Sequence, residues 1–200
     1  MKRKSDHILQ FKIVLKSIKP PIWRRIQVPA VYTFRDFHVA IQDAMGWTDS
    51  HLHEFNVSDP IYDARVRIGI PDEEFPERKT LPEEEQTIAA WFTQENSSAD
   101  YLYDFGDDWE HEVRMEKIMA VEPDVRYPRC TAGRRACPPE DCGGVVGYER
   151  ILEILSDAHH MEYAEMLEWV GEDFDPERFE PKGALFSDSA TRLKLTPEEC

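Results

Sequence analysis

Long apolar runs are missing from this 200-residue chain. No stretch approaches the roughly 20 apolar residues that a membrane-spanning helix needs. The basic start, Met1–His7, is not followed by the unbroken apolar core and small-residue cleavage site of a signal peptide. We therefore expect a cytoplasmic protein with no membrane partner. Cytoplasmic thiols are reduced, which favours metal-binding or structural roles for cysteine over disulfide formation.

Basic residues are also scarce. The chain has 24 Lys and Arg against 40 Asp and Glu, which gives a net charge of -16 at pH 7. Such a surface repels phosphate backbones unless its basic residues are segregated into a patch. We therefore expect a protein or small-molecule partner before nucleic acid, and a nucleic-acid accessory role is kept as an alternative.

Several catalytic signatures are absent as well. The sequence has no glycine-rich phosphate loop ending in Lys-Ser or Lys-Thr, no dinucleotide fingerprint, no nucleophile elbow and no His-Glu-x-x-His helix. These absences remove the enzyme classes that depend on those motifs. They leave open whether the protein is an enzyme, and no residue is assigned a catalytic role.

Alternating apolar and polar side chains are present and predict strands. Residues 8–18 and 22–28 alternate on either side of Lys19-Pro20, which indicates a hairpin with a short turn. The Gly106-Asp107-Asp108 turn joins two further strands. The later segments with this period are 51–57, 61–70, 101–105 and 109–119.

Helical spacing replaces the alternation after the first two strands. Thr33 is predicted as the N-cap of a helix that runs to about Met45, with Asp36 completing a capping box and Gly46 ending the helix. Residues 71–86 are rich in Pro, Glu and Arg and predict a solvated loop. Two later helical patterns cover residues 148–155 and 163–170.

This order of elements predicts the α+β class, with an antiparallel or mixed sheet covered by helices. An irregular Cys/Gly/Pro loop at 127–147 precedes a C-terminal helical part. We expect a single domain over residues 8–179 and an irregular acidic tail over residues 180–200. The apolar faces of the predicted elements form one expected core, made of Leu9, Phe11, Ile13, Leu15, Phe37, Ile41, Phe55 and Val113.

Three cysteines within this loop suggest a structural zinc site. Zn²⁺ takes thiolate and imidazole ligands tetrahedrally, and the gaps of six and four residues leave a fourth ligand to be supplied. The predicted metal ligands are Cys130, Cys137, Cys142 and His111. Other candidates for the fourth position are His51, His53 and Asp141. The alternative is that the thiols are reduced and pack the loop, or that two of them form an oxidisable pair.

Three further polar groups are candidates for ligand binding. Two histidines two residues apart on a strand point to the same side, although they also suit the edge of a core. Clustered carboxylates in a turn suit a cation or acid–base chemistry, and Arg beside Trp suits an anion unless it forms a cross-strand salt bridge. The predicted ligand-binding residues are Arg24, His51, His53, Asp104, Asp107, Asp108, Trp109, Arg134 and Arg135. We expect the histidines, the acidic turn and the cysteine loop to converge.

Five blocks carry a family resemblance: Ile18–Ile26, Met45–Phe55, Tyr103–His111, Pro128–Gly144 and Trp169–Pro176. In this order they resemble the plasmid pRiA4b ORF-3-like family over about residues 8–179. The resemblance implies an α+β fold and no established activity. It also implies an association with plasmids and mobile elements, where some members carry a resolvase label. That label is unsupported, since the chain lacks a nucleophilic Ser among arginines near its start and a helix-turn-helix.

Two functions follow as hypotheses. The first is a binding or scaffold module in which the cysteine loop is structural, with or without zinc. The second is a metal-dependent, hydrolase-like enzyme acting on a phosphate-bearing substrate. In the second, the histidines and Asp107 or Asp108 hold a metal or transfer protons, and Arg24, Arg134 and Arg135 orient the anion. An open coordination position favours the enzyme, and a closed four-ligand site favours the scaffold.

Overall fold

The computed structural model describes residues 6–62, 64–72 and 76–192. Within them one mixed sheet has the strand order β5-β4-β3-β6-β7-β1-β2-β8, and all neighbours are antiparallel except the parallel pair β4–β5. The strands are β1 (His7–Leu15), β2 (Trp23–Pro29), β3 (His53–Ser58), β4 (Arg65–Gly69), β5 (Thr80–Pro82), β6 (Ser98–Tyr103), β7 (Trp109–Ala120) and β8 (Arg129–Arg134). The α+β prediction is confirmed.

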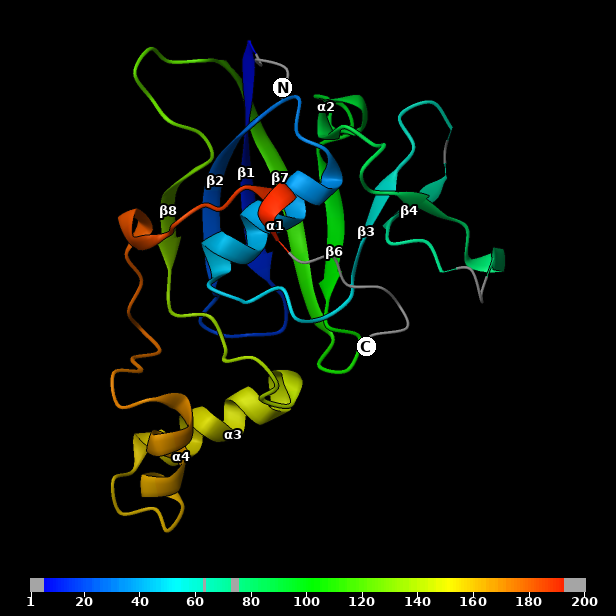
Figure 1. Cartoon of the computed structure of the whole chain (residues 1–200). Coiled ribbons are helices and arrows are strands. Elements are labelled where there is room, and N and C mark those ends of the chain that lie inside the picture. The colour runs from blue at the N-terminus through cyan, green and yellow to red at the C-terminus, as the bar shows by residue number, and fades with distance from the viewer. Residues whose placement is uncertain (1–5, 63, 73–75, 193–200) are drawn as a thin grey trace.

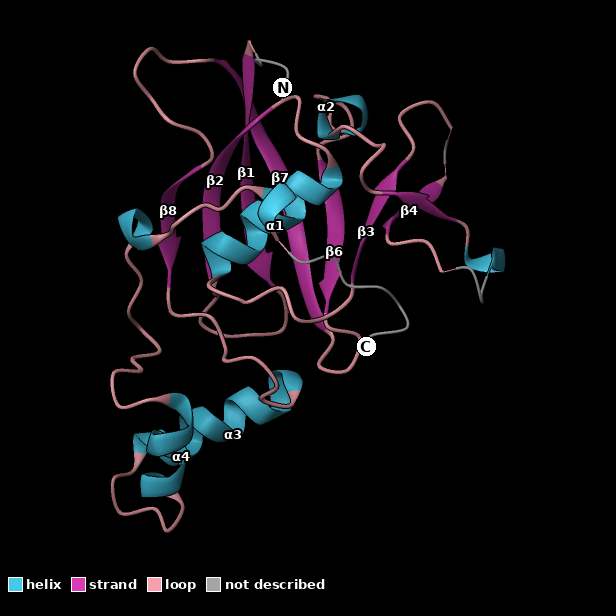
Figure 2. Ribbon diagram, viewed as in Figure 1, coloured by secondary structure: helices cyan, strands magenta, loops and turns pink. Residues whose placement is uncertain are grey.

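Four α-helices accompany the sheet in the described residues: α1 (Phe34–Met45), α2 (Ile88–Trp91), α3 (Gly144–Ser156) and α4 (Tyr163–Val170). Short 3₁₀ helices are η1 (Pro76–Arg78), η2 (Pro181–Gly183) and η3 (Ser189–Thr191). Helix α1 lies across one face of the sheet, whereas α3 and α4 lie beyond one end of it (Figure 1 and Figure 2). Among the described residues, no helix has the length and apolar character to cross a bilayer.

Helix α1 forms where its capping residues predict it. The Thr33 side chain accepts a hydrogen bond from the backbone N–H of Asp36, whose own side chain accepts from the N-cap backbone. At the other end Gly46 adopts the left-handed conformation, with φ 100°. The apolar side of the helix then packs on the sheet, where the Phe11 and Phe37 rings lie 4.5 Å apart. All eight residues of the predicted core are buried.

Strand β8 lies in the segment where no periodic element was predicted. Its pairing with β2 places Gly133 opposite Arg24, and a Cβ on Gly133 would come within 2.9 Å of the Trp23 carbonyl oxygen. Close approach therefore selects small residues here, which removes the apolar alternation by which a strand is recognised. Likewise β5 and η1 form within the predicted loop at 71–86, and α3 begins four residues before its predicted start at Tyr148.

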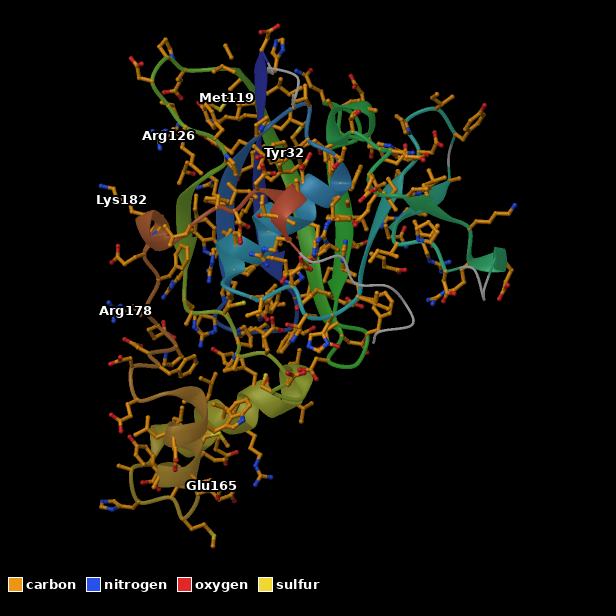
Figure 3. The ribbon with its side chains drawn as sticks, in the orientation of Figure 1. Tyr32, Met119, Arg126, Glu165, Arg178 and Lys182 are labelled. Carbon is orange, nitrogen blue, oxygen red and sulfur yellow. The ribbon has the colours of Figure 1, made fainter. Side chains whose placement is uncertain are left out.

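The chain beyond β8 makes two separate contacts with the sheet layer. Helices α3 and α4 pack on each other, and α4 buries none of its residues; Glu165 on α4 projects into solvent (Figure 3). The tail then returns across α1, where the Ser187 N–H donates to the Asp43 carboxylate over 2.8 Å. Residues 193–200 of the predicted tail lie outside the described residues.

Candidate functional site

The loop that joins β8 to α3, residues 135–143, docks against one end of the sheet. The indole N–H of Trp47 donates to the Pro138 carbonyl over 3.0 Å. The Glu140 carboxylate accepts from the Thr48 N–H over 2.8 Å and from the Tyr103 hydroxyl over 3.1 Å. Because these partners follow α1 or end β6, the loop is held by segments far apart in the sequence.

Close approach explains the glycines at the end of this loop. The Gly143 N–H donates to the Asp107 carboxylate over 3.1 Å. A Cβ on Gly144 would lie 2.5 Å from the Asp107 carbonyl oxygen, and one on Gly147 would lie 1.8 Å from that of Cys142. Larger residues would push the loop off the β6–β7 turn.

Three side chains from these segments meet at the docked loop, and we call them the His51 site: His51, Asp104 and Asp141. The Nε2 of His51 lies 3.1 Å from an Asp141 oxygen and 3.7 Å from Asp104 Oδ2. All three ligand atoms lie within 4.8 Å of one another. The acidic turn, the histidine segment and the cysteine loop therefore meet here.

Asp104 is oriented toward the histidine by its own turn. Its Oδ1 accepts the backbone N–H groups of Gly106 and Asp107, at 2.9 and 3.3 Å. This leaves Oδ2 directed at His51 and the carboxylate almost enclosed, with the side chain 10% exposed. Hydrogen bonds of this kind fix the direction of a metal-ligating carboxylate.

The His51 Nε2 atom is buried and makes no hydrogen bond within the described residues. Its approach to Asp141 is close enough for an ion pair but does not meet hydrogen-bond geometry. Two ligands that each lie about 2.0–2.2 Å from one ion are separated by roughly 2.8–3.6 Å. The distances around His51 are close to that range. The His51 Nε2 atom lies between two carboxylates and makes no hydrogen bond. This arrangement suits a metal ligand.

A second polar cluster is buried between α1 and the sheet, and its centre is a histidine pair, His38 and His53. Their rings stack with centroids 3.3 Å apart and planes 5° apart. His38 lies 2.5 Å from Asp49 through Nε2 and 2.8 Å from the Tyr101 hydroxyl through Nδ1. His53 Nε2 lies 2.6 Å from Glu83. Both rings therefore have carboxylate partners inside the protein.

Burial sets the charges in this cluster. Burial first, and the charge of the nearby His53 second, lower the pKa of His38 to about 4 against the opposing effect of Asp49. Burial alone would raise the pKa of Asp49, but its hydrogen bond with His38 and the charge of Arg35 hold that pKa below its usual value. Burial alone would also raise the pKa of Glu83, but the charge and the hydrogen bond of His53 outweigh it and hold that pKa below its usual value. The carboxylates are therefore ionised at neutral pH and His38 is neutral.

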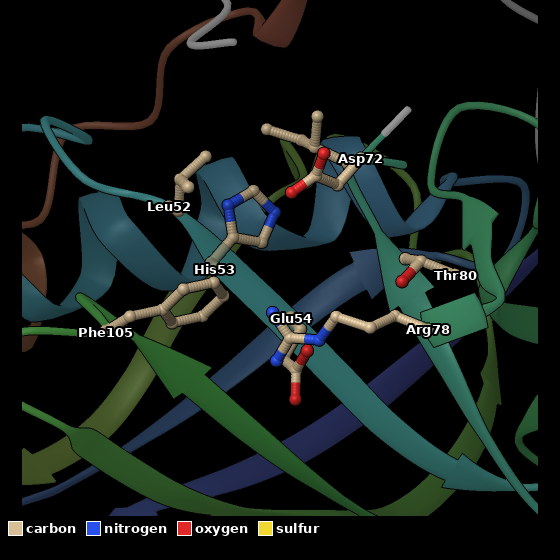
Figure 4. A pocket seen from close by; sticks show the side chains of 8 residues that line it. Leu52, His53, Glu54, Asp72, Arg78, Thr80 and Phe105 are labelled. Atoms are coloured by element: carbon tan, nitrogen blue, oxygen red, sulfur yellow. The ribbon is translucent and has the colours of Figure 1, made fainter. Parts of the chain in front are cut away.

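The buried cluster is the other group in the described residues whose ligand atoms gather closely enough for a metal, through His38, Asp49 and His53. It differs from the His51 site because its hydrogen bonds are already made. The adjoining pocket, with the His53 ring at its wall (Figure 4), has a volume of about 40 Å³. That is room for water but not for a substrate.

The predicted zinc ligands do not form a metal-binding group. The described residues contain two groups of gathered ligand atoms, and neither includes a cysteine. His111 is fully buried on β7, where its Nδ1 lies 3.3 Å from the Tyr101 carbonyl oxygen. Cys130, Cys137 and Cys142 are separate free thiols, half-buried against the core. The four predicted ligands are therefore not gathered in this conformation, because strand pairing turns His111 into the core.

Burial also determines the chemistry of these thiols. It raises the pKa of Cys130 and Cys137, and it raises that of Cys142 to about 12. Thiols of this kind are protonated and unreactive at neutral pH. The geometry agrees with the alternative that the cysteines pack the loop.

His51 and His53 do not lie on one strand, contrary to the prediction. Strand β3 begins at His53, which pairs with Tyr103 on β6. His51 precedes the strand, so the alternation of side chains does not extend to it. As a result His53 belongs to the buried histidine pair and His51 to the docked loop.

Arg24 is a structural residue, and neither the predicted anion site nor the salt-bridge alternative describes it. It is 1% exposed, and its Nε donates to the Ala44 carbonyl over 2.8 Å. Its Nη1 donates to the carbonyls of Trp23 and Arg134, at 2.9 and 3.1 Å. The Phe179 ring lies 3.7 Å from the guanidinium. These contacts leave it fixed between strands, α1 and the tail.

The remaining predicted ligand-binding residues lie outside the His51 site. Arg135 is buried and holds Glu177 and the Pro20 carbonyl, both at 2.7 Å. Trp109 is fully buried in the core. Asp108 shapes the turn with φ 53°, and Arg134 is exposed at the end of β8. Of the nine predicted residues, His51 and Asp104 supply the site, and Asp107 supports it by binding the loop.

Sequence reasoning missed most of the buried cluster. Asp49 and Glu83 lie in segments without periodicity, so nothing marked them as buried. His38 gave a signal, because it falls on the apolar stripe of the predicted helix beside Phe37 and Ile41. A histidine on such a stripe requires a buried polar partner.

Fold and site together define an α+β protein whose eight-stranded mixed sheet carries a His/Asp cluster at the end where a Gly/Pro loop docks. The chain belongs to the plasmid pRiA4b ORF-3-like family, whose model matches residues 7–183. It is 36% identical over 169 residues to the uncharacterized protein y4hQ of Sinorhizobium fredii, covering 84% of each chain. It is also similar to the crystal structure of MM3350, a protein of unknown function from Methanosarcina mazei. The TM-score is 0.86 and the identity 46%, over 92% of this chain and 100% of that one. The relatives fix the fold and leave the activity open.

Proposed function

We propose that this protein is a binding module that holds a divalent metal ion at the His51 site. The observation that carries the proposal is the buried His51 Nε2, which makes no hydrogen bond in the described residues and stands between Asp104 and Asp141. One imidazole and two carboxylates suit Zn²⁺ first, with Mn²⁺ as the next candidate. A metal here would replace the missing hydrogen bond and neutralise two adjacent carboxylates.

The metal would also fix the docked loop. Asp141 is the ligand that the loop contributes, and it adopts a left-handed backbone with φ 55°. Asp tolerates this conformation, and such residues concentrate at functional sites. Since the Asp141 side chain is 74% exposed, the ion would retain an open side. A binding partner or small molecule with an anionic group would complete the coordination there.

Calorimetry and elemental analysis of the purified protein test the proposal. We expect one Zn²⁺ per chain, and at least tenfold weaker binding in His51→Gln and in Asp104→Asn. His159→Gln is the matched control, because His159 is exposed in the α3–α4 connection. Affinity should fall at acid pH, since protons compete for the ligand atoms. Metal that depends on Cys137 but not on His51 would contradict the proposal and restore the cysteine set.

A metal-dependent hydrolase is the second candidate. The site has three protein ligands, and one of them, Asp141, faces solvent. Such an open site is typical of a catalytic rather than a closed structural metal. A bound Zn²⁺ supplies Lewis-acid activation of a phosphoryl oxygen or of water. Turnover of para-nitrophenyl phosphate and its bis ester by metal-loaded protein, lost in Asp104→Asn, would support it. Equal rates with and without metal would exclude it.

A further inference from the structure

The second face of the sheet carries a line of positive charge. Phe11 packs on α1, so the next residue, Lys12, points to the opposite face. Lys12 pairs directly with Arg25 on β2 and with Arg114 on β7. We call these three residues the cation row. Because adjacent strands lie about 4.8 Å apart, the row extends over roughly 10 Å.

The cation row is unfavourable for stability. Like charges directly opposite on neighbouring strands repel, and a chain with 40 acidic residues offers many carboxylates for compensation. Arg25 has one, since Glu116 binds its guanidinium at 2.6 and 2.9 Å, and the Lys12 charge also acts on this carboxylate. Within the described residues, no carboxylate forms an ion pair with Lys12 or Arg114. A repulsive arrangement that lies in the open indicates a binding surface.

A second line of polar and basic residues lies beside the row, in which the two glutamines are buried and hydrogen-bonded to their neighbours. Gln10 pairs with Lys117 on β7 and with Gln27 on β2, and Gln27 pairs with Arg129 on β8. The two lines share one groove. Its lining includes Gln10, Lys12, Arg25, Arg114, Glu116 and Lys117. Arg126 lies near the β8 end of the sheet (Figure 3). Four basic residues and one acidic residue, Glu116, thus line the groove, although the whole chain is acidic.

We propose that this groove binds single-stranded nucleic acid. A row of evenly spaced cations matches a polymer with a repeated charge, whereas one phosphate group requires donors that converge on a point. Trp23 stands at the end of the row, with Lys12 5.1 Å and Arg25 5.3 Å from its ring. A polar sheet face with cations and an aromatic residue suits an unpaired strand. The acidic remainder of the surface would direct the strand to this face.

The sheet geometry favours a single strand over a duplex. The major groove of DNA accepts a helix or a two-stranded ribbon, because it is about 12 Å wide. The cation row instead crosses three adjacent strands, β7, β1 and β2, of a broad sheet. A flexible strand can follow such a surface, whereas a rigid duplex touches it along one line. This inference does not depend on the metal proposed at the His51 site.

Fluorescence anisotropy with labelled oligo(dT) and oligo(U) of about 12 nucleotides tests the proposal. Binding to three phosphates should give a salt slope of about -2, and the double variant Lys12→Gln/Arg114→Gln should reduce its magnitude by about 1.4. We expect at least tenfold weaker binding in that variant. Arg150→Gln is the control, because Arg150 is exposed on α3 and should leave binding unchanged. Lys12→Arg keeps the charge and should retain affinity.

Any of the following results would overturn the proposal. Absence of binding at low salt, or equal binding by the double variant, would remove the groove as the site. Equal affinity for a duplex of the same length would remove the preference for a single strand. Equal competition by a phosphopeptide or by inorganic phosphate would show that one phosphate suffices. Misfolding is recognised separately, since removing like charges should raise rather than lower the melting temperature.

Discussion

The histidine pair and the His51 site contain the same kinds of side chain in opposite conditions. His53 and its neighbour His38 are buried with carboxylate and hydroxyl partners. His51, two residues earlier, has a buried nitrogen that no hydrogen bond satisfies. The difference shows that burial alone does not mark a functional histidine. An unsatisfied polar atom is the better indicator where carboxylates face it, as at His51, because the buried His111 Nε2 is also unsatisfied but lies in the core.

The largest effect is expected when a histidine is removed from the buried cluster, where its hydrogen bonds are already made. His38→Ala leaves a cavity and removes one partner each from Asp49 and Tyr101, which keep Arg35 and Gln42, so we expect a loss of about 2–5 kcal/mol in the free energy of unfolding. Urea denaturation measures it. His51→Ala is the matched change in the unsatisfied site and should cost less than about 1 kcal/mol in metal-free protein. Equal losses would mean that the two sites are not different in kind.

Acid should separate the two sites next. The folded-state pKa of His38, about 4, lies below its ordinary 6.5. Between these values the unfolded chain binds a proton that the folded chain excludes, so stability falls as pH falls, by on the order of 3 kcal/mol. Asp49 and Glu83 act in the same direction, because lowering the pH through their depressed pKa values removes their contribution. His38→Gln should flatten the pH profile of the urea midpoint, and a profile as steep as that of the parent protein would contradict this assignment.

Metal should act on the other site alone. Free Zn²⁺ at about 100 times its Kd should stabilise the folded protein by about 2.7 kcal/mol. Thermal melting with and without Zn²⁺ measures the shift. Asp104→Asn should abolish it, while His38→Gln should lower the baseline and keep the increment. An increment lost only in His38→Gln would place the metal in the buried cluster.

The smallest effect concerns the cation row, the other unfavourable polar arrangement. Lys12→Gln removes repulsion from both Arg25 and Arg114 and should stabilise the protein by about 0.2–1 kcal/mol. Urea denaturation at low salt resolves this gain, which added salt should shrink. A loss of stability would mean that Lys12 contributes more through its contact with Trp23 than it costs.

Local signals in the sequence were sufficient for helix α1 and for the first strand. The Thr33 cap, the Gly46 stop and the alternation in the first strand depend on neighbouring residues, so they could be predicted. Strand β8 could not, because Gly133 reflects the closeness of Trp23 rather than a period in its own segment. Burial of Glu83 likewise depends on a partner, Arg35 or His53, from a distant segment.

The candidate sites depend on contacts that no single segment encodes. His51 and Asp104 were identifiable as residue types near turns, whereas their meeting with Asp141 required the docked loop. The assignment of His51 and His53 to one strand was wrong, because β3 begins at His53. The cation row is a matter of register, since Lys12, Arg25 and Arg114 are aligned only by strand pairing. Composition showed a scarcity of basic residues and could not show their alignment.

Arg24 has a consequence for how the protein opens. Helix α1 has no basic residue in its last turn, and the Arg24 guanidinium from β2 binds the carbonyl of Ala44 there. A positive charge at this end compensates the helix dipole. The same guanidinium binds the last carbonyl of β8, at Arg134. Fraying of the helix end would therefore leave the buried Arg24 charge without one of its carbonyl partners. The amide hydrogens of the last turn of α1 and of β8 should for this reason exchange with solvent as one cooperative unit.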